Sequence, residues 1–600
     1  MRITKQDRHR QRIDEKRAEF GREIFERGIR DPDHQRGEKW PSNAAEPAHG
    51  DDDQEVDEIV ERVARRNGQQ ICAKASIKIA FDQYDATLRL EGLKKLSFNS
   101  MMGDDSQLRE RLAYELYRRM NVISPQAGHA FLTLNGDPLG LFGVVEDLDD
   151  HFAQQHWPSA ATGNLYKEAW PIELDPTSYT PLLQTNEKNM PDNSLMAMFA
   201  SALFAAKTPA QLPAVIEQFA HTDQLLRYMA VDRAISNYDG ITTFYCDQTG
   251  KDCTNHNYFW YQHPAEKRFI LGPWDLTQTF LVQTVFDKLP PWNQIPSDCG
   301  KRTVAEDAVL LAPGCDLVFQ GLIGAGSPAY DKALDQLLGV WDVGALDQLV
   351  DGWAAEINDA TELDPNGPGA VAWRAAVENL KAIIAALRER LEATRAKRTV
   401  AAFGLTVPGT TDFEAATALG FALGASSEVN PRSGGVFGLQ QAGALGGAQD
   451  VRFAFELTND LSPDPALDVP FANARLPLGA GMVDLTGLQQ IQLLGTADQL
   501  RTVRIEIDSP KYGNVGSVDT DLGRYGWEVL VGPAANTVMV SAADLALPPG
   551  TPAKATLAEV LANASGLVIS PQPRGRNDAG LLPSGKSDVG FVRLDDITIQ

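Results

Sequence analysis

The chain has 600 residues, of which 43% are hydrophobic and 22% are charged. Since one domain usually holds roughly 100–200 residues, this length predicts more than one domain. Acidic residues outnumber basic ones by 80 to 55, and the resulting formal charge of -25 disfavours binding to nucleic acid or to an anionic membrane surface.

The apolar and cysteine patterns bear on the compartment. No run reaches the roughly 18 apolar residues that cross a bilayer, so we predict no membrane span. The N-terminus is basic but has no apolar segment, so it does not resemble a secretory signal. Two local cysteine pairs suit disulfides in an oxidising compartment, and five reduced cytosolic thiols are the alternative. The pairs are Cys246 with Cys253 and Cys299 with Cys315. We expect a secreted or surface protein and leave a cytoplasmic location open.

Residues 1–70 are densely charged. Two segments, Asp7–Arg27 and Glu55–Arg66, have helical character, but few apolar residues recur in them at helical spacing. Without enough apolar surface to bury, we expect a flexible or loosely docked extension.

From residue 71 to about 147 the pattern is that of strands around one helix. Residues 75–81 and 93–100 alternate like strands. Asp104 then gives a helix N-cap signal before an amphipathic helix that carries leucines on one face. Two further strands follow, and Asn135-Gly136 between them is typical of a hairpin turn.

The rest of the chain divides into a helical part and a β part. Residues 150 to about 400 are mostly helical, with one β-like stretch at 258–280. After about 400, short strands alternate with Gly, Pro and Asn turns, which predicts an all-β sandwich over 412–600.

Three polar side chains of the helical part suggest chemistry. Asp232 and Asn237 lie five residues apart at the end of a predicted helix, and Asp275 follows at the end of a predicted strand. Hard oxygen ligands suit Mg²⁺ or Mn²⁺, and a carboxylate beside them can take the proton of an attacking hydroxyl in phosphoryl transfer. Helix-end capping by Asp232 and Asn237, and a turn at Asp275, is the commoner reading of this spacing alone.

Residues 71–395 resemble the CotH kinase family, an atypical protein-kinase-like family. The matching segments come in order: KASIKIAF, GLKKLSFNSMMGDDSQLRERLAYELYRRMNV, LTLNGDPLGLFGVVEDLDDHF, GNLYKE, DRAISNYDG, NHNYFWYQ and PWDLTQTF. The resemblance implies an α+β two-lobed kinase-like domain over 71–400, with a small lobe at 71–147 and a large lobe at 148–400.

The resemblance also implies roles for single residues. Asp232 takes the role of the catalytic aspartate, and Asn237 and Asp275 take that of metal ligands. One lysine of the small lobe would hold the phosphates of ATP and pair with Glu110, with a solvated strand residue as the alternative for each. The three candidate lysines are Lys74, Lys78 and Lys95.

Further positions match the family around this set. Glu146 would begin the hinge between the lobes, and Lys167 would reach the nucleotide or cap a strand. Asp239 and Asn257 would orient the loop near the site. The sequence departs from the family at Thr277, where another aspartate is usual.

Residues 412–600 resemble jelly-roll carbohydrate-binding modules. Trp527 and Tyr525 would stack on sugar rings in such a module, or else belong to the core or a turn. Asp595 and Asp596 would hold a structural Ca²⁺, with a plain surface pair as the alternative.

Together these observations predict an atypical protein kinase that transfers phosphate from ATP to Ser or Thr of a surface or secreted protein, with Mg²⁺ or Mn²⁺. The alternative is a non-catalytic surface or assembly protein that binds glycan through the sandwich. The candidate site residues are Asp232, Asn237, Asp275, Lys74, Lys78, Lys95, Glu110, Glu146 and Lys167.

Overall fold

The computed structural model describes most of the chain from residue 63 onward. The segments that it leaves out after that point are 67–68, 73, 86, 91, 102, 187–190, 238, 247–252, 282–290, 304–308, 398–403, 414–421, 427–433, 442–444, 446, 448, 459–471, 479–481, 510–524, 548–554 and 573–586. The predicted helix at Asp7–Arg27 lies outside the described residues.

The first described element is a short hairpin. Strand β1 (Val63–Arg66) pairs antiparallel with β2 (Gln69–Cys72), so that Val63 lies opposite Cys72. The helix predicted for Glu55–Arg66 is therefore wrong over its last four residues. Its weak helical periodicity is outweighed here by pairing with the next strand, as non-local hydrogen bonds can override local propensity.

A four-stranded antiparallel sheet in the order β3-β4-β6-β5 follows, with one helix beside it. Its elements are β3 (Ile77–Ala80), β4 (Lys95–Asn99), α3 (Arg109–Arg119), β5 (Ala127–Leu134) and β6 (Asp137–Val145). Asn135 and Gly136 both have positive φ, 54° and 93°, so the predicted Asn-Gly hairpin turn is confirmed. Before α3, the Asp104 carboxylate accepts hydrogen bonds from the backbone N–H groups of Ser106 and Arg109. The N-cap residue itself is Leu108, so the predicted N-cap at Asp104 is wrong in position, although Asp104 still bonds the first N–H of the helix.

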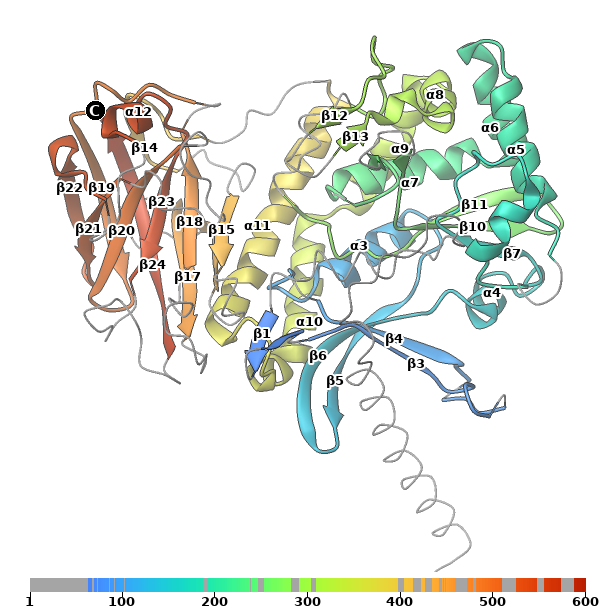
Figure 1. Cartoon of the computed structure of the whole chain (residues 1–600), viewed down its shortest axis with the longest axis horizontal. Coiled ribbons are helices and arrows are strands. Elements are labelled where there is room, and N and C mark those ends of the chain that lie inside the picture. Colours follow the sequence, from blue (N-terminus) through green and yellow to red (C-terminus); the bar gives the residue numbers. More distant parts are fainter. Residues whose placement is uncertain are drawn as a thin grey trace, which may run out of the picture.

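The segment from 150 to 397 is mostly helical, as predicted. Its helices are α4 (Asp150–His156), α5 (Ser194–Ala205), α6 (Leu212–Phe219), α7 (Thr222–Ala234), α8 (Leu317–Gly324), α9 (Ser327–Val340), α10 (Val343–Leu363) and α11 (Ala370–Arg395). Shorter 3₁₀ turns include η3 (Pro176–Leu182), η4 (Pro209–Gln211) and η6 (Pro313–Cys315). One hydrophobic core extends from α3 through α5–α10 to α11, while α4 packs in a smaller cluster with β7 and β10. Figure 1 shows the helices gathered on one side of the four-stranded sheet.

Two small sheets interrupt the helices. The first, in the order β11-β10-β7, contains β7 (Asn164–Lys167), β10 (Tyr258–His263) and β11 (Arg268–Pro273). The second, in the order β12-β13-β8-β9, contains β8 (Phe244–Cys246), β9 (Cys253–Thr254), β12 (Arg302–Thr303) and β13 (Val309–Leu311). The sequence predicted only the β10–β11 stretch, because the other strands are two to four residues long and too short for an alternating pattern.

Two disulfides belong to the second small sheet. Cys246 of β8 is bonded to Cys253, its partner in β9. Cys299, just before β12, is bonded to Cys315 in η6, just after β13. Both cysteine pairs suggested by the sequence are therefore disulfides in the structure.

The last third of the chain is a β-sandwich, and it packs beside α11 (Figure 1). One sheet has the order β16-β17-β24-β19-β22, with β14 also paired to β24, and the other has the order β15-β18-β23-β20-β21. The bounds are β14 (Gly409–Thr411), β15 (Ala422–Ser426), β16 (Gly434–Gln441), β17 (Gln449–Thr458), β18 (Ala472–Pro477), β19 (Gln490–Ala497), β20 (Arg501–Asp508), β21 (Gly526–Val531), β22 (Asn536–Ser541), α12 (Leu557–Leu561), β23 (Gly566–Pro571) and β24 (Ser587–Ile599).

The sandwich core follows from alternation along each strand. In β20, Val503, Ile505 and Ile507 point into the core. Trp527 belongs to the same core, where its indole N–H donates to the carbonyl oxygen of Ser541 (2.8 Å). Tyr525 packs partly against this core. Trp527 is therefore buried in the core, as the core alternative predicts, whereas Tyr525 is half-buried beside it.

No helix in the described segments is both long enough and apolar enough to cross a membrane.

Candidate active site

The end of α7 brings Asp232 and Asn237 together in the protein interior. Both are 0% exposed. Asp232 Oδ1 accepts a hydrogen bond from Asn237 Nδ2 (2.9 Å) and one from the Tyr117 hydroxyl of α3 (3.3 Å). Burial raises the pKa of the Asp232 carboxyl, while the Arg233 guanidinium and these two hydrogen bonds oppose that rise.

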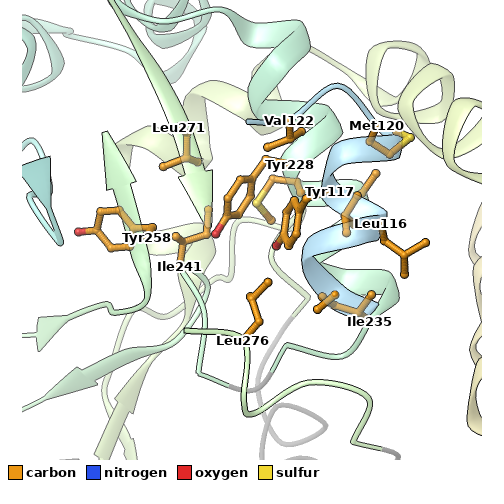
Figure 2. Close-up of a cluster of buried hydrophobic side chains, with 14 of the residues drawn as sticks. Leu116, Tyr117, Met120, Val122, Tyr228, Ile235, Ile241, Tyr258, Leu271 and Leu276 are labelled. Atoms are coloured by element: carbon orange, nitrogen blue, oxygen red, sulfur yellow. The ribbon is translucent and has the colours of Figure 1, made fainter. Parts of the chain in front are cut away.

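An apolar cluster holds this pair in place. Tyr117, Tyr228, Ile235, Ile241 and Leu276 come from α3, α7 and the two loops of the site, and all are buried. Figure 2 shows their side chains grouped around α3 and the loops. The backbones that carry Asp232, Asn237 and Asp275 are therefore fixed by packing on both sides of the polar groups.

Asp275 lies on the loop after β11 with a positive φ of 38°. Its Oδ1 accepts hydrogen bonds from the backbone N–H (3.2 Å) and the hydroxyl (2.7 Å) of Thr277. The loop is joined to the Asp232 loop by a hydrogen bond from Phe280 N–H to the carbonyl oxygen of Ile235 (2.6 Å). Thr277, which replaces the usual family aspartate, thus orients Asp275 by an Asx turn.

One side-chain oxygen of this site, that of Asn237, has the surroundings expected of a ligand for a hard cation. The Oδ1 atom of Asn237 is buried and accepts no hydrogen bond from any residue that the structure describes. A buried carbonyl oxygen without a partner is costly, and an amide oxygen is a normal ligand for Mg²⁺ or Mn²⁺. Asn237 is therefore a candidate ligand for such an ion, and Asp275, on the adjoining loop, is the second ligand that the sequence predicts.

Glu110 of α3 lies next to this site and accepts hydrogen bonds from uncharged groups. Its carboxylate accepts hydrogen bonds from Asn99 Nδ2 (2.9 and 3.1 Å) and from the backbone N–H of Leu276 (3.5 Å). Burial, together with the nearby carboxylate of Asp275, raises the pKa of Glu110 to about 8. The expected partner of Glu110 was a lysine, and the structure gives it Asn99 instead.

The three candidate lysines have different surroundings. Lys74 is 4% exposed, and its Nζ pairs with Asp364 Oδ2 (2.7 Å) and donates to the carbonyl oxygen of Leu141. Lys78 pairs with Asp147 Oδ1 (2.8 Å). Lys95 and Ala80 lie opposite each other, and so do Lys78 and Ser97, which places Lys78, Lys95 and Asn99 on one face of the sheet. Lys78 and Lys95 therefore lie on the same face of the sheet as Asn99, which donates to Glu110, whereas Lys74 is paired with Asp364.

Glu146 and Lys167 lie on other elements, and of the two it is Lys167 that has a contact next to a site residue. Gln126 N–H donates to Glu146 Oε2 (3.0 Å), which also lies 3.4 Å from His156 Nε2. Lys167, at the end of β7, has its Nζ 5.6 Å from the centre of the Trp274 ring, next to Asp275. Lys167 is therefore the candidate cation on the Asp275 side.

Asp239 and Asn257 are in direct contact. Asn257 Nδ2 donates to both the backbone carbonyl oxygen and the Oδ2 of Asp239 (2.7 Å each). The backbone N–H of Asn257 donates to Glu168 Oε1 (3.1 Å). This contact ties the loop after Asn237 to the start of β10, as expected for residues that orient the loop.

Three contributors were not singled out from the sequence: Tyr117, Asn99 and Gly240. Tyr117 lies seven residues after Glu110, on the same face of α3, so helical periodicity could have found it. Gly240 closes over the pair, since a Cβ at this position would lie 2.6 Å from Asp232 Oδ1. No local pattern indicates Asn99 or Gly240, because their roles arise from contacts with residues distant in the chain.

The described residues contain no group of three or more His, Cys, Asp or Glu side chains that could hold a metal ion. At the active site this is consistent with a set completed by an asparagine and, in phosphoryl transfer, by phosphate oxygens. In the sandwich, Asp595 is 3% exposed and its Oδ1 accepts from the backbone N–H of Asp596 (2.9 Å). Calcium binding there stays a prediction.

Comparisons with known proteins identify a family and two relatives in sequence. The family model described as CotH kinase protein matches residues 64–392. The chain is 24% identical over 216 residues to the inner spore coat protein H of Bacillus subtilis (strain 168), covering 34% of this chain and 55% of that protein. It is 36% identical over 69 residues to an inner spore coat protein H-like protein of the same organism, covering 12% and 21%. The chain thus spans about half the length of the first of these relatives.

Among solved structures, the matches cover about a third of the chain. A family 11 carbohydrate-binding module from Clostridium thermocellum matches with 13% identity and a TM-score of 0.21, over 32% of this chain and 96% of that one. The carbohydrate-binding module CBM28 matches with 10% identity and a TM-score of 0.21, over 33% and 97%.

Proposed function

Because the chain belongs to the CotH kinase family, we propose that it is an ATP-dependent, Mg²⁺- or Mn²⁺-dependent kinase that phosphorylates Ser or Thr of a protein. The observation that supports this most is the buried Asp232–Asn237 pair, in which Asn237 Oδ1 is left without a partner. The domain would be kinase-like, with residues 71–147 as the small lobe and residues 148–400 as the large lobe.

The proposed reaction forms a bond between the acceptor hydroxyl oxygen and the γ-phosphorus of ATP and breaks the bond from that phosphorus to the β,γ-bridging oxygen. ADP leaves, and the hydroxyl proton passes to the Asp232 carboxylate. Bound Mg²⁺ would offset the charge of the phosphates. Asp232 is 0% exposed, so contact with a hydroxyl requires the groups that cover it, including Asn237 and Gly240, to move.

Other residues would bind the metal ion and the phosphates of ATP and orient them for the transfer. Asn237 and Asp275 would hold the metal. Lys78 or Lys95 would contact the phosphates from the face that carries Asn99, and Lys167 would contact them from the Asp275 side. Lys74 is a weaker candidate because Asp364 already neutralises it. Glu146 would lie at the hinge, where it bonds Gln126.

The test is transfer of radiolabelled phosphate from ATP, with Mn²⁺, to the chain itself and to casein. We expect Asp275→Asn and Asn237→Ala each to reduce transfer by at least about a hundredfold, as loss of a metal ligand should. They should also remove the thermal stabilisation by Mn²⁺–ATP, about 2.7 kcal/mol at a hundredfold excess over Kd.

The matched control is Asp484→Asn in the sandwich. Asp484 Oδ1 accepts from Thr486 N–H (2.9 Å) and Thr486 Oγ1 (2.7 Å), which is the same turn that Asp275 makes with Thr277. This control should keep wild-type transfer. Full transfer by Asp275→Asn would contradict the proposal.

A surface or spore-coat location is proposed alongside this activity. The two disulfides support it, since such bonds persist outside the reducing cytoplasm. The relatives are coat proteins by name.

A second candidate function is glycan binding by the sandwich. The face of the β20 sheet that points away from the core carries polar side chains: Asn473, Arg504, Glu506 and Ser570. Asn473 is 4% exposed, and its Oδ1 has no hydrogen-bond partner. Asn473, Arg504 and Glu506 are buried and Arg504 pairs with Glu506 (2.8 Å), so sugar hydroxyls would reach these groups only if the residues that cover them moved. The full chain should then bind immobilised polysaccharide, Asn473→Ala should weaken binding, and Thr537→Ala on the other sheet should not. No binding by the wild-type chain would contradict this candidate.

A further inference from the structure

Helix α11 contacts three parts of the molecule that lie far apart in the sequence. Near its start, the indole N–H of Trp373 donates to the carbonyl oxygen of Ser106, just before α3 (3.1 Å). In the same half, Ala375 and Ala376 pack against Ala454 of the sandwich. Near its end, the guanidinium of Arg390 donates to the hydroxyl of Ser236. One continuous helix thus joins the sandwich, the segment just before α3 and the Asp232 loop.

Ser236 has a special position in that loop. It lies between Asp232 and Asn237, is 2% exposed and has a φ of 52°. A residue with a side chain rarely adopts this left-handed conformation and persists in it only where its surroundings hold it. The reversal at Ser236 lets Asn237 N–H donate to the Asp232 carbonyl oxygen (3.0 Å) and brings the Asn237 amide back to the Asp232 carboxylate. The Arg390 hydrogen bond anchors the residue on which this geometry depends.

The sandwich contact with α11 leaves little space. Ala454 is on the face of β17 that points away from the sandwich core and is 0% exposed. Phe591 of β24 packs beside it, and the guanidinium of Arg452 lies 4.5 Å from the centre of the Phe591 ring. Methyl groups facing each other allow close approach of helix and sheet, so a larger side chain at Ala454 would push the two apart.

We propose that Arg390 is a positioning residue for the Asp232 loop, and that docking of the sandwich on α11 sets the position of Arg390. Ala376 and Arg390 are 14 residues apart, about 21 Å along a rigid helix. Contact between the sandwich and α11 would then affect the position of Asn237 at the site. This rests on the proposed function, because Asn237 matters to the site as a metal ligand.

The first test measures the Mn²⁺ concentration that gives half-maximal phosphate transfer by the full-length chain, and half-maximal stabilisation by ATP at fixed nucleotide. Arg390→Gln should raise both by about tenfold, since a displaced Asn237 binds metal less well. Arg390→Lys, which keeps the charge and one donor, should restore part of the loss.

A rescue separates positioning from general stability. Glycine adopts positive φ without support, so Ser236→Gly in the Arg390→Gln background should bring the Mn²⁺ requirement back toward the wild-type value. A purely structural role for Arg390 would leave that requirement unchanged in every variant, and such a result would overturn the proposal. If the wild-type chain binds Mn²⁺–ATP but transfers no phosphate, the kinase assignment fails, while the binding titration still decides the role of Arg390.

The second test separates the sandwich from α11. Ala376→Arg with Ala454→Arg places two like charges in the contact and should increase the radius of gyration in X-ray scattering. The Mn²⁺ requirement should rise as in Arg390→Gln, and adding Arg390→Gln should raise it no further. Thr537→Arg, at an exposed position of β22, is the control and should change neither quantity. An unchanged Mn²⁺ requirement in the double variant, with or without a larger radius, would contradict the link.

Discussion

The immediate neighbours of the Asp232 carboxylate set its position and its hydrogen bonds. The carboxylate accepts hydrogen bonds from Asn237 and Tyr117, and the backbone of Gly240 lies close against it. A buried carboxylate needs such donors, because an unpaired one would become protonated. The glycine is required here for space, since any side chain would meet the polar pair.

We therefore predict that Gly240→Ala lowers phosphate transfer by at least about tenfold and the free energy of unfolding by about 1–3 kcal/mol, because the new methyl group overlaps the Asp232–Asn237 pair. Urea unfolding and the transfer assay measure the two effects. Gly339→Ala in α9, where a Cβ meets nothing within 4 Å, should leave transfer intact and stabilise the helix slightly. Equal behaviour of the two variants would refute the prediction.

At the scale of elements, the four-stranded sheet β12-β13-β8-β9 connects the two loops of the site. Strand β8 begins four residues after Gly240, and β12 and β13 follow the loop of Asp275. These strands are only two or three residues long, so hydrogen bonds alone hold them weakly. The disulfides supply the missing constraint, one within the β8–β9 pair and one around the β12–β13 pair.

We expect that replacing Cys299 and Cys315 together by serine lowers the free energy of unfolding by about 3 kcal/mol, the chain-entropy value for a loop of this length. The Cys246–Cys253 disulfide closes a shorter loop, so replacing both of its cysteines by serine should cost about 2 kcal/mol. Urea unfolding with and without reductant measures both. Reductant should destabilise the wild-type chain, and it should have the smaller effect on each double variant. A wild-type chain indifferent to reductant would contradict the expectation.

At the scale of the whole molecule, α10 and α11 brace the N-terminal sheet against the helical part. The Lys74–Asp364 pair is buried on both sides, and Asp364 Oδ2 also accepts from Leu141 N–H (3.0 Å). Arg111 of α3 reaches Glu356 of α10 (2.8 Å). The brace limits how far the two parts can separate, which matters for any nucleotide that binds between them.

We predict that Asp364→Asn lowers the free energy of unfolding by about 3–5 kcal/mol, because it leaves the Lys74 ammonium buried without its counter-charge. Lys74→Met with Asp364→Leu should recover much of that loss, since neither charge remains. Asp351→Asn, which removes the partner of the exposed Lys381–Asp351 pair, should change stability by less than about 1 kcal/mol. Chemical denaturation of the three variants decides, and an Asp364→Asn chain as stable as Asp351→Asn would be incompatible with a buried pair.

The sequence by itself determined the local elements and the residues of the candidate site. The Asn-Gly turn, the amphipathic helix that carries Glu110 and the alternating strands of the sandwich depend on neighbours close in the chain, so the sequence pattern predicts them. The family resemblance then pointed to Asp232, Asn237 and Asp275.

The tertiary structure decided which of those residues meet. Lys74 and Glu110 were both plausible members of one ion pair, yet Lys74 bonds Asp364, 290 residues away, and Glu110 bonds Asn99. The Arg390–Ser236 contact spans 154 residues. Such partners depend on how helices and sheets pack, and no short-range periodicity encodes that, because the free energy of each contact is set by burial that exists only in the folded chain.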